Sequence, residues 1–294
     1  MRISSLPGQR RAIPGRMVRV DGIPLHVVRE GRGPVCVLTA GMGMSWFDWD
    51  AVAALLRSHR TVVRFDRPGL GLSAPAPEPP TLAAEIRRIR HVLDALGLAG
   101  PCTLVGHSMA ALHAEAFART HPRRSAGLVL VDASLAPATR PRLPRAARTA
   151  AAGGLAGALA VTGLPRVLGP TARRLTAHAA TVRPHSAGPY VRDSYRTSRV
   201  LRACALENAT FPYQAHDLAA LRLLYRLPAV PVSVLAAYGG GETRRELDWL
   251  ERQRALAATL GARFSVAAPS GRLVMSDAPE AVARAVLAQS ERWA

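Results

Sequence analysis

Short apolar runs recur along this 294-residue chain, and stretches with helical periodicity lie between them. The apolar runs have the length and composition of buried parallel strands, and they occur at residues 34–39, 60–65, 102–105, 128–131, 230–236 and 263–267. Residues 17–20 and 23–28 flank an Asp-Gly pair, a pattern that predicts a hairpin at the start of the chain.

Helical periodicity follows most of these runs, at residues 48–56, 81–96, 108–120, 244–260 and 279–293. Strands and helices that alternate through short connections are typical of a sheet covered by helices on both faces. The pattern therefore predicts an α/β fold with a doubly wound, mostly parallel sheet.

The alternation stops near Ser134. Residues 135–215 are rich in Arg, Ala and Pro, contain helical stretches and carry no strand signal. We therefore expect an α/β core formed by residues 1–134 and 216–294, interrupted by a helical cap at 135–215. The uncharged stretch at 149–165 lies in this insertion. Its length is marginal for a membrane span, so we expect a cap helix there and no stable membrane span.

Charge adds one feature to this outline. All 39 basic residues are arginine, against 20 acidic residues, and the formal charge is +19. Such an excess could attract nucleic acid or an anionic surface. The arginines are spread along the chain, however, and no basic motif with interleaved aromatic residues occurs. We therefore expect a small molecule as substrate or ligand, and no nucleic acid.

Cysteine usage points to a reducing environment. The chain has three cysteines, Cys36, Cys102 and Cys204, without the paired spacing of a disulfide framework or a zinc site. Cys36 and Cys102 fall in strand-like runs, so we expect buried free thiols and a cytoplasmic protein. The first fifteen residues contain no apolar segment of the secretory type. No metal or organic cofactor is implied.

The strongest chemical motif is the segment TLVGHSMAAL at residues 103–112, where a strand turns into a helix at Ser108. Gly106 and Ala110, two residues before and after this serine, are small enough for a sharp turn that exposes its oxygen. The helix N-terminus behind it favours developing negative charge. The segment resembles the nucleophile elbow of the α/β-hydrolase family, G-x-S-x-G, with Ala110 in place of the second glycine.

Two further segments match the same family in the same order. Residues 40–43, Ala-Gly-Met-Gly, resemble the family's oxyanion loop, with Ala40 where a histidine is usual. The resemblance implies that the backbone N–H groups of Met42 and Met109 hold a tetrahedral oxyanion. Residues 66–73 resemble the family's D-R-x-G-x-G-x-S loop, for which we expect a structural role.

A third matching segment, residues 270–280, departs from the family at one position. The family normally reads S-G-H before an apolar run, and the histidine is the general base; this chain has Arg272 there. A serine hydroxyl needs a neighbouring base to become a nucleophile. A guanidinium group stays protonated and offers no acceptor. We therefore expect Arg272 to break the Ser–His–acid relay.

Another histidine could serve as the general base in place of the one that is missing at position 272. His107 and His113 lie near the serine in sequence, although the elbow usually directs the neighbouring side chain away. His178, His185 and His216 lie in the insertion or at its exit, above the expected site. Any of them could replace the missing histidine only if the fold brings it to Ser108.

The acid of the relay also has alternatives. Family members carry it after the strand that follows the elbow helix, or after the next strand. Asp132 fits the first position, whereas Glu242 and Asp248 fit the second less well. We favour Asp132 and expect it to form an ion pair with Arg272.

The resemblance implies a serine hydrolase that acts on an ester or a similar small acyl bond. Arg272 predicts impaired activity, because the general base is replaced. The alternative is a non-catalytic protein that uses the same pocket to bind a ligand, for which Arg272 would favour a carboxylate or phosphate group.

Overall fold

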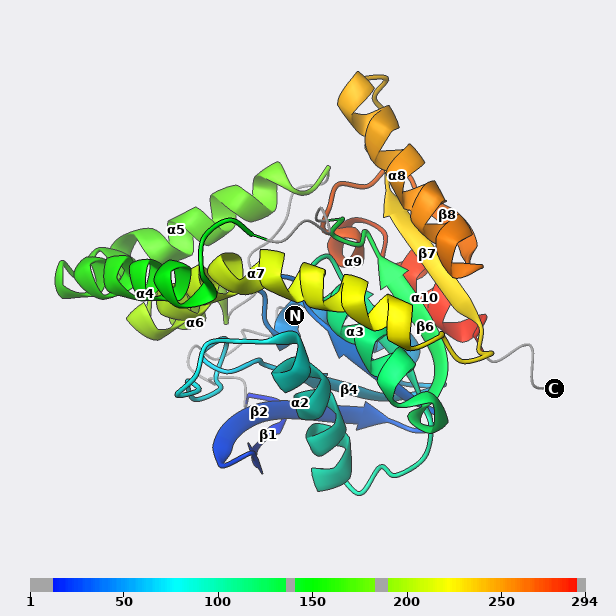
Figure 1. Cartoon of the computed structure of the whole chain (residues 1–294), viewed down its shortest axis with the longest axis horizontal. Helices are drawn as coiled ribbons and strands as arrows, with labels where there is room; N and C mark the ends of the chain where they lie inside the picture. The colour runs from blue at the N-terminus through cyan, green and yellow to red at the C-terminus, as the bar shows by residue number, and fades with distance from the viewer. Residues whose placement is uncertain (1–12, 136–140, 183–189, 290–294) are drawn as a thin grey trace, which may run out of the picture.

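A computed structural model describes residues 13–135, 141–182 and 190–289 (Figure 1). Its eight strands form one sheet in the order β1-β2-β4-β3-β5-β6-β7-β8. The strands are β1 (Arg16–Val20), β2 (Ile23–Gly31), β3 (Val35–Thr39), β4 (Thr61–Phe65), β5 (Cys102–His107), β6 (Ser125–Val131), β7 (Val232–Ala237) and β8 (Arg263–Ala267). The first two pairings in this order are antiparallel and the other five are parallel, which confirms the predicted mostly parallel sheet.

The helices fall close to the predicted stretches. They are α1 (Asp50–Leu56), α2 (Leu82–Ala95), α3 (Ala110–Thr120), α4 (Arg145–Val161), α5 (Leu164–Ala179), α6 (Val191–Tyr195), α7 (Ser198–Leu224), α8 (Arg244–Leu260), α9 (Val274–Asp277) and α10 (Pro279–Leu287). A 3₁₀ turn at Trp46–Trp49 precedes α1, and another at Pro122–Arg124 precedes β6. The last helix ends at Leu287, earlier than the predicted end near residue 293, because the chain turns at Ala288 and Gln289; residues 290–294 lie outside the described part.

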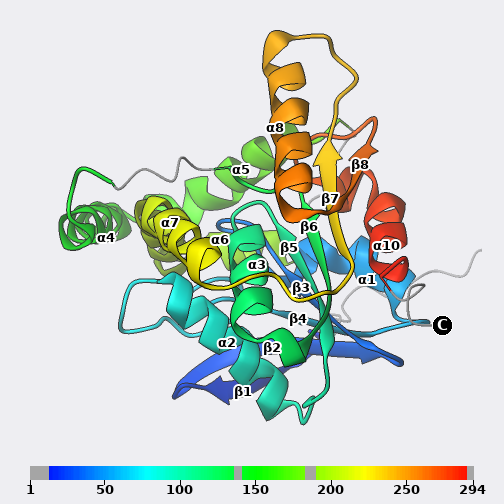
Figure 2. The ribbon, with the colours of Figure 1, turned by 45° about the vertical axis from the view of Figure 1, so that its right-hand side comes forward.

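Helices cover both faces of the sheet, and strand side chains alternate between them. Val37, Leu104 and Val234 pack with α2, α3 and α8 on one face. Their neighbours Leu38, Val105 and Leu235 pack with α1, α9 and α10 on the other. Figure 2 shows α3 and α8 on one side of the sheet and α1 and α10 on the other. Successive strand residues point to opposite faces, which explains why the strands are apolar at nearly every position.

The helical insertion lies beside the carboxyl ends of the strands as a group formed by α4 to α7 (Figure 1). Within it, α4 packs along α7 and α5 packs against α6. Helix α7 continues past residue 215 to Leu224, and its residues Ala215 and Leu218 belong to the cluster that covers the sheet. The helical stretch therefore ends later than the predicted boundary, while the division into core and cap stays a prediction.

No single helix in residues 13–135, 141–182 and 190–289 is both long and apolar enough to cross a bilayer. Helices α4 and α5 satisfy the length and composition criteria only as a pair, and the pair is bent by 113°.

Candidate active site

Ser108 occupies the sharp turn that the sequence predicts. Strand β5 ends at His107 and α3 begins at Ala110, with Ser108 between them at φ +52°, a left-handed backbone conformation that is unusual for serine. A Cβ on Gly106 would lie 2.5 Å from the Ala110 carbonyl oxygen and 2.7 Å from Ala111 Cα. Glycine is therefore required there, because the first turn of α3 passes directly over the strand. The sequence predicts a helix from Ser108 onward. The helix begins two residues later, at Ala110, because the left-handed backbone of Ser108 is not helical.

Among the described residues, the hydroxyl of Ser108 contacts another hydroxyl and no base. Its Oγ lies 2.9 Å from Ser134 Oγ, and either oxygen can donate that hydrogen bond. The Ser134 backbone N–H also donates to the Ser108 carbonyl at 3.1 Å. Ser134 comes just after β6, the strand beside the elbow, so the parallel pairing of β5 and β6 brings the two serines together.

Arg272 and Asp132 meet, as the sequence predicts. Arg272 Nη2 lies 3.3 Å from Asp132 Oδ2, and the guanidinium stacks 4.1 Å from the centre of the Trp249 ring. Trp249 Nε1 donates to Asp132 Oδ1 at 2.7 Å, and the Ala237 N–H donates to the same oxygen at 3.3 Å. The Arg272 side chain is half exposed, whereas the Asp132 side chain is fully buried. Glu242 and Asp248, the alternative acids, are both exposed.

One oxygen of Asp132 remains incompletely satisfied. Oδ2 is buried and has no hydrogen bond to any group in the part of the chain that the structure describes. Arg272 is close enough for an ion pair but is not aligned as a donor, so the Coulomb attraction is present without the directed bond. Burial raises the pKa of Asp132, while Arg272 and the Trp249 hydrogen bond act in the opposite direction.

His107 is the one histidine among the described residues that lines the same cavity as Ser108, and it is not arranged as a base. Its Nε2 pairs with the Arg272 carbonyl oxygen at 2.8 Å, an acceptor that assigns the ring proton to Nε2. Burial is the main cause that lowers the pKa of His107 to about 4; the hydrogen bond to the Arg272 carbonyl raises this pKa, and the charges of nearby arginines lower it. Its buried Nδ1 has no partner among the described groups.

The other candidate histidines lie elsewhere. His113 is buried in α3 and bonds to Gln214 of α7 at 2.7 Å. His178 lies exposed near the end of α5, and His216 lies on α7. His185 is outside the described residues. None of the described histidines forms a hydrogen bond with the Ser108 hydroxyl.

The two backbone donors expected for an oxyanion lie at the elbow and in the facing loop. Neither the Met42 N–H nor the Met109 N–H donates to an acceptor within the described ranges. Met109 is buried at the start of α3, and Met42 lines the cavity beside Ser108. Both N–H groups therefore lack an acceptor within the part of the chain that the structure describes.

A buried ion pair holds the loop that carries Met42. Arg67 donates to the carbonyl oxygens of Ala40 and Gly41, and its Nε donates to Glu207 Oε1 at 2.6 Å. Glu207 Oε2 accepts from the Gly43 N–H at 2.7 Å. Burial alone would lower the pKa of Arg67, but the charge of Glu207 raises it. The loop at residues 66–73 thus has the structural role that was predicted, whereas Glu207 was not anticipated.

Ser108 opens into a cavity of about 610 Å³ between the core and α5 and α7. Its walls are mostly apolar and include Leu159, Leu164, Leu168, Val200 and Leu201 of the insertion. Arg272 and Arg173 are the charged residues that line it. Arg173 is paired with Asp48 at 2.5 Å, whereas Arg272, among the described lining residues, has no directed bond to a carboxylate.

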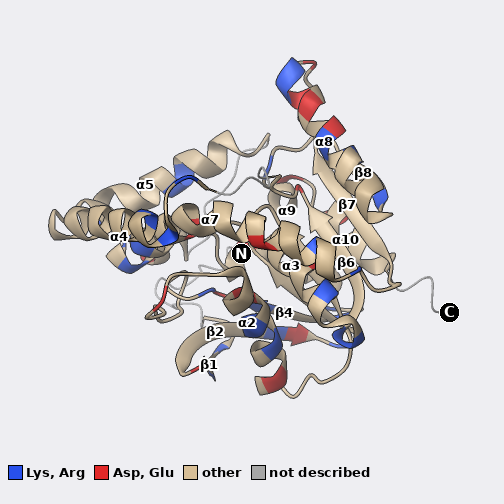
Figure 3. Cartoon of the chain, in the orientation of Figure 1, with Lys and Arg blue, Asp and Glu red and all other residues tan. Residues whose placement is uncertain are grey.

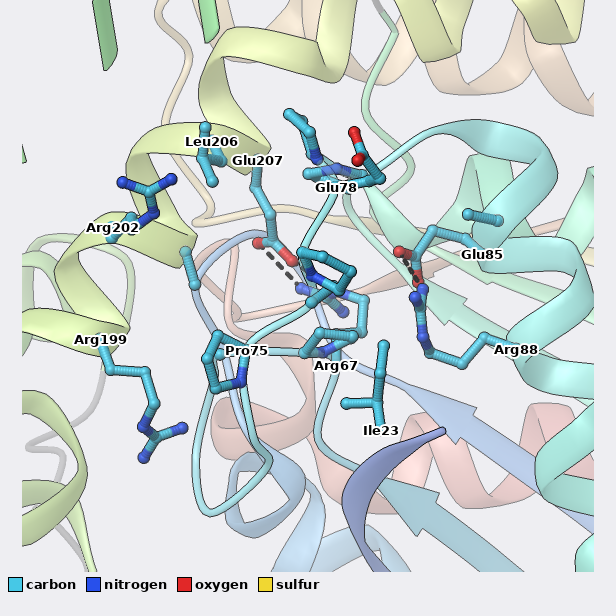
Figure 4. A pocket seen from close by; sticks show the side chains of 18 of the residues that line it. Ile23, Arg67, Pro75, Glu78, Glu85, Arg88, Arg199, Arg202, Leu206 and Glu207 are labelled. Atoms are coloured by element: carbon cyan, nitrogen blue, oxygen red, sulfur yellow. Dashed lines mark hydrogen bonds and ion pairs between the residues drawn. The ribbon is translucent and has the colours of Figure 1, made fainter. Parts of the chain in front are cut away.

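A second cavity of about 670 Å³ lies on the opposite face of α7 (Figure 4). Figure 4 shows Arg67 paired with Glu207, and Arg88 paired with Glu85, beside the loop that carries Pro75. Within these two pairs the acid and the base neutralise each other, and the described residues that line this cavity include neither a serine–histidine pair nor Ser108. We therefore place the candidate chemistry in the smaller cavity.

Comparison with known proteins identifies the family. The profile described as "Alpha/beta hydrolase family" matches residues 36–285. The chain belongs to the α/β-hydrolase family. Its sheet order and its elbow agree with this assignment.

Individual relatives cover the chain to different extents. The chain is 35% identical over 114 residues to a pimeloyl-[acyl-carrier protein] methyl ester esterase of Aeromonas hydrophila, which is 37% of this chain and 42% of that one. The match thus spans less than half the length of these curated relatives. Among solved structures, Cfl2 of Burkholderia cenocepacia has a TM-score of 0.68 at 26% identity and covers 92% of both chains. The epoxide hydrolase CorEH has a TM-score of 0.71 at 20% identity, covers 95% of this chain and 99% of its own, and shows the fold alone.

Proposed function

We propose that this α/β-hydrolase is a serine hydrolase for an ester or similar small acyl bond, with turnover impaired by Arg272. The observation that carries the proposal is the Arg272–Asp132 contact beside Ser108, which has no base among the described residues. The elbow, the free N–H groups and the cavity are those of an acyl-transfer site, and the general base is the missing part.

The chemistry follows from what remains. Ser108 Oγ would attack the acyl carbon, and the Met42 and Met109 N–H groups would stabilise the resulting oxyanion. Within the described ranges no basic group contacts Ser108 to accept its proton, because Ser134 is a hydroxyl and Arg272 is a cation. Loss of a base from such a relay typically costs several powers of ten in rate and leaves the contribution of the oxyanion donors.

The unsatisfied oxygen of Asp132 supports this reading of the site. In a complete relay, the acid accepts a hydrogen bond from the Nδ1–H of the base. Asp132 Oδ2 is buried, lacks a hydrogen bond within the described residues, and faces the side chain at position 272. A histidine at this position would therefore find its acceptor already in place.

The cavity indicates which acyl groups would fit. Its walls are apolar and its volume of about 610 Å³ suits a compact apolar acyl chain or ring. We therefore propose a small apolar ester as substrate. The buried free thiols of Cys36 and Cys102 support activity in a reducing compartment such as the cytoplasm.

Labelling of Ser108 by a fluorophosphonate probe tests the proposal, because the probe reports how readily the serine attacks. The wild-type chain should label slowly, Ser108→Ala should not label, and Arg272→His should label at least about a hundredfold faster, on the order of what a general base contributes. Equal labelling of wild type and Arg272→His would contradict the proposed roles. Labelling that persists in Ser108→Ala would show that the probe reacts with another residue.

A binding function is the second candidate, and the position of Arg272 favours it. Its guanidinium is half exposed and lines the cavity, so it can hold the carboxylate of a ligand. If binding is the function, phenylacetate should bind the wild-type chain, as measured by calorimetry, and should bind Arg272→Gln at least about tenfold more weakly. Equal affinity would remove this candidate.

A further inference from the structure

Several large apolar side chains are exposed along one face of α5 and at the end of α4. Four of them lie on α5 at relative positions 0, 3, 4 and 11, which places them within about 100° around the helix axis. The fifth ends α4, next to the first of these. Their exposed fractions are 88% for Val161, 44% for Leu164, 71% for Val167, 53% for Leu168 and 65% for Leu175. We call these five residues the cap stripe.

This degree of exposure is unusual for residues of this size. Scattered single apolar residues on a surface need no explanation, but a row of five on adjoining helices is typical of an interaction site. Nothing in the described part of the chain covers the stripe, and α4 and α5 form the outer end of the insertion in Figure 1.

The charge around the stripe has one sign. Helices α4 and α5 contain Arg145, Arg148, Arg166, Arg173 and Arg174 and no acidic residue. Arg173 is neutralised by Asp48, while Arg145, Arg166 and Arg174 are exposed. Figure 3 shows these two helices with basic residues only, in contrast to the outer end of α8, where both signs occur. An apolar row on helices whose charged residues are all basic complements an anionic lipid surface.

The stripe also adjoins the candidate active site. Leu164 and Leu168 belong to the stripe and, at the same time, line the cavity that contains Ser108. A molecule held at the level of the stripe would therefore lie close to that cavity.

We propose that the cap stripe docks the protein on the surface of an anionic lipid bilayer, with α5 lying along the interface and its arginines toward the headgroups. The docking itself is independent of the proposed function. The consequence that an apolar ester passes from the lipid phase into the Ser108 cavity rests on that function.

Co-sedimentation with vesicles tests the docking. The wild-type chain should pellet with vesicles of phosphatidylcholine mixed with phosphatidylserine. The double variant Val167→Asp/Leu175→Asp should bind at least about tenfold more weakly, because two apolar side chains no longer enter the interface. Leu223→Asp on α7 is the matched control, since Leu223 is 88% exposed but lies outside the stripe, and it should bind like the wild type. Circular dichroism shows whether each variant is folded.

A second set of variants tests the role of charge. Arg166→Gln and Arg174→Gln should each weaken binding to the phosphatidylserine vesicles roughly fivefold, the effect of one basic residue near such a surface. Arg252→Gln, at an exposed position on α8, should have no effect. Ser108→Ala should bind vesicles like the wild type, so a failure of the proposed hydrolase activity would not affect this measurement.

Three results would overturn the docking proposal. The first is a wild type that does not pellet with anionic vesicles. The second is equal vesicle binding by the stripe variant and the Leu223→Asp control. In the third, sedimentation velocity without vesicles shows a dimer that the stripe variants convert to a monomer, while vesicle binding is absent. That result would assign the stripe to an interface between copies of the chain.

Discussion

Two hydroxyl groups, those of Ser108 and Ser134, share one hydrogen bond at 2.9 Å in the centre of the candidate site. This bond orients the Ser108 side chain. The Ser134 hydroxyl cannot act as the general base for Ser108, because a hydroxyl is a weak base. The absence of a base within the described residues should therefore lower the rate of hydrolysis much more than the Ser134 contact changes it.

Ser134→Ala separates these two effects. A neutral hydrogen bond contributes about 1 kcal/mol, so its loss should change the hydrolysis of p-nitrophenyl butyrate by less than about tenfold. A rise of a hundredfold or more in Ser134→Ala would mean that Ser134, and not Arg272, restrains the nucleophile.

His107 should make stability depend on pH. Burial lowers its pKa from 6.5 to about 4, so the unfolded chain binds a proton that the folded chain does not bind between these values. The free energy of unfolding should therefore be almost independent of the titration of His107 above pH 6.5. It should fall as the pH decreases toward 4, by about 2 kcal/mol between pH 7 and pH 5.

Urea unfolding of the wild type and of His107→Gln at both pH values measures this contribution. His113 is also buried with a lowered pKa and acts in the same direction in both proteins, so the difference between them isolates His107. An equal loss of stability in the two proteins would show that His107 is not the group that titrates.

Sequence reasoning located the residues of the site that lie in motifs and missed those that do not. Ser108 and Arg272 follow from their segments, and the structure brings Asp132 to Arg272 as predicted. Trp249 bonds to Asp132 across 117 positions, and Glu207 bonds to Gly43 across 164. Such contacts depend on how helices pack, and no local pattern around Trp249 or Glu207 signals them.

At the scale of elements, α7 has two roles. One face lines the Ser108 cavity, while Glu207 on another face holds the loop at residues 40–43 through Arg67 and Gly43. The insertion is thereby tied directly to the backbone that would bind an oxyanion.

Removal of Glu207 should destabilise the protein strongly. Glu207→Ala leaves the Arg67 guanidinium buried without its carboxylate, which typically costs about 3–5 kcal/mol. Asp94→Ala is the matched control, because Asp94 pairs with Arg124 near the surface, where a pair contributes less than about 1 kcal/mol. Denaturant unfolding of both variants checks the contrast. Similar losses in the two would show that the buried pair has no special role.

At the scale of the whole molecule, the periodicity of the sequence was sufficient for the sheet and its covering helices. Strand β8 and helix α8 were predicted at their observed bounds, because each has an uninterrupted pattern with clear ends. The insertion was less predictable. Helix α7 continues through Pro212 and past residue 215, since its later residues, such as Leu218, pack on the core and stabilise the helix from outside.

Net charge should also act on the whole molecule. A formal charge of +19 favours expansion through self-repulsion, and salt screens this repulsion over about 10 Å at 0.1 M. Addition of sodium chloride should therefore raise the Tm by a few degrees in a calorimetric scan. A lower Tm in salt would show that the attractive ion pairs outweigh the repulsion.

The central claim is that the site is complete except for its base, and the pH–rate profile of Arg272→His tests it most directly. The variant should hydrolyse p-nitrophenyl butyrate with a kcat/KM at least about a hundredfold above that of the wild type. Its rate should rise with pH through an inflection near the ordinary histidine pKa of about 6.5, and the wild type should show no such inflection. An Arg272→His variant that is folded, yet as slow as the wild type and without this inflection, would contradict the account.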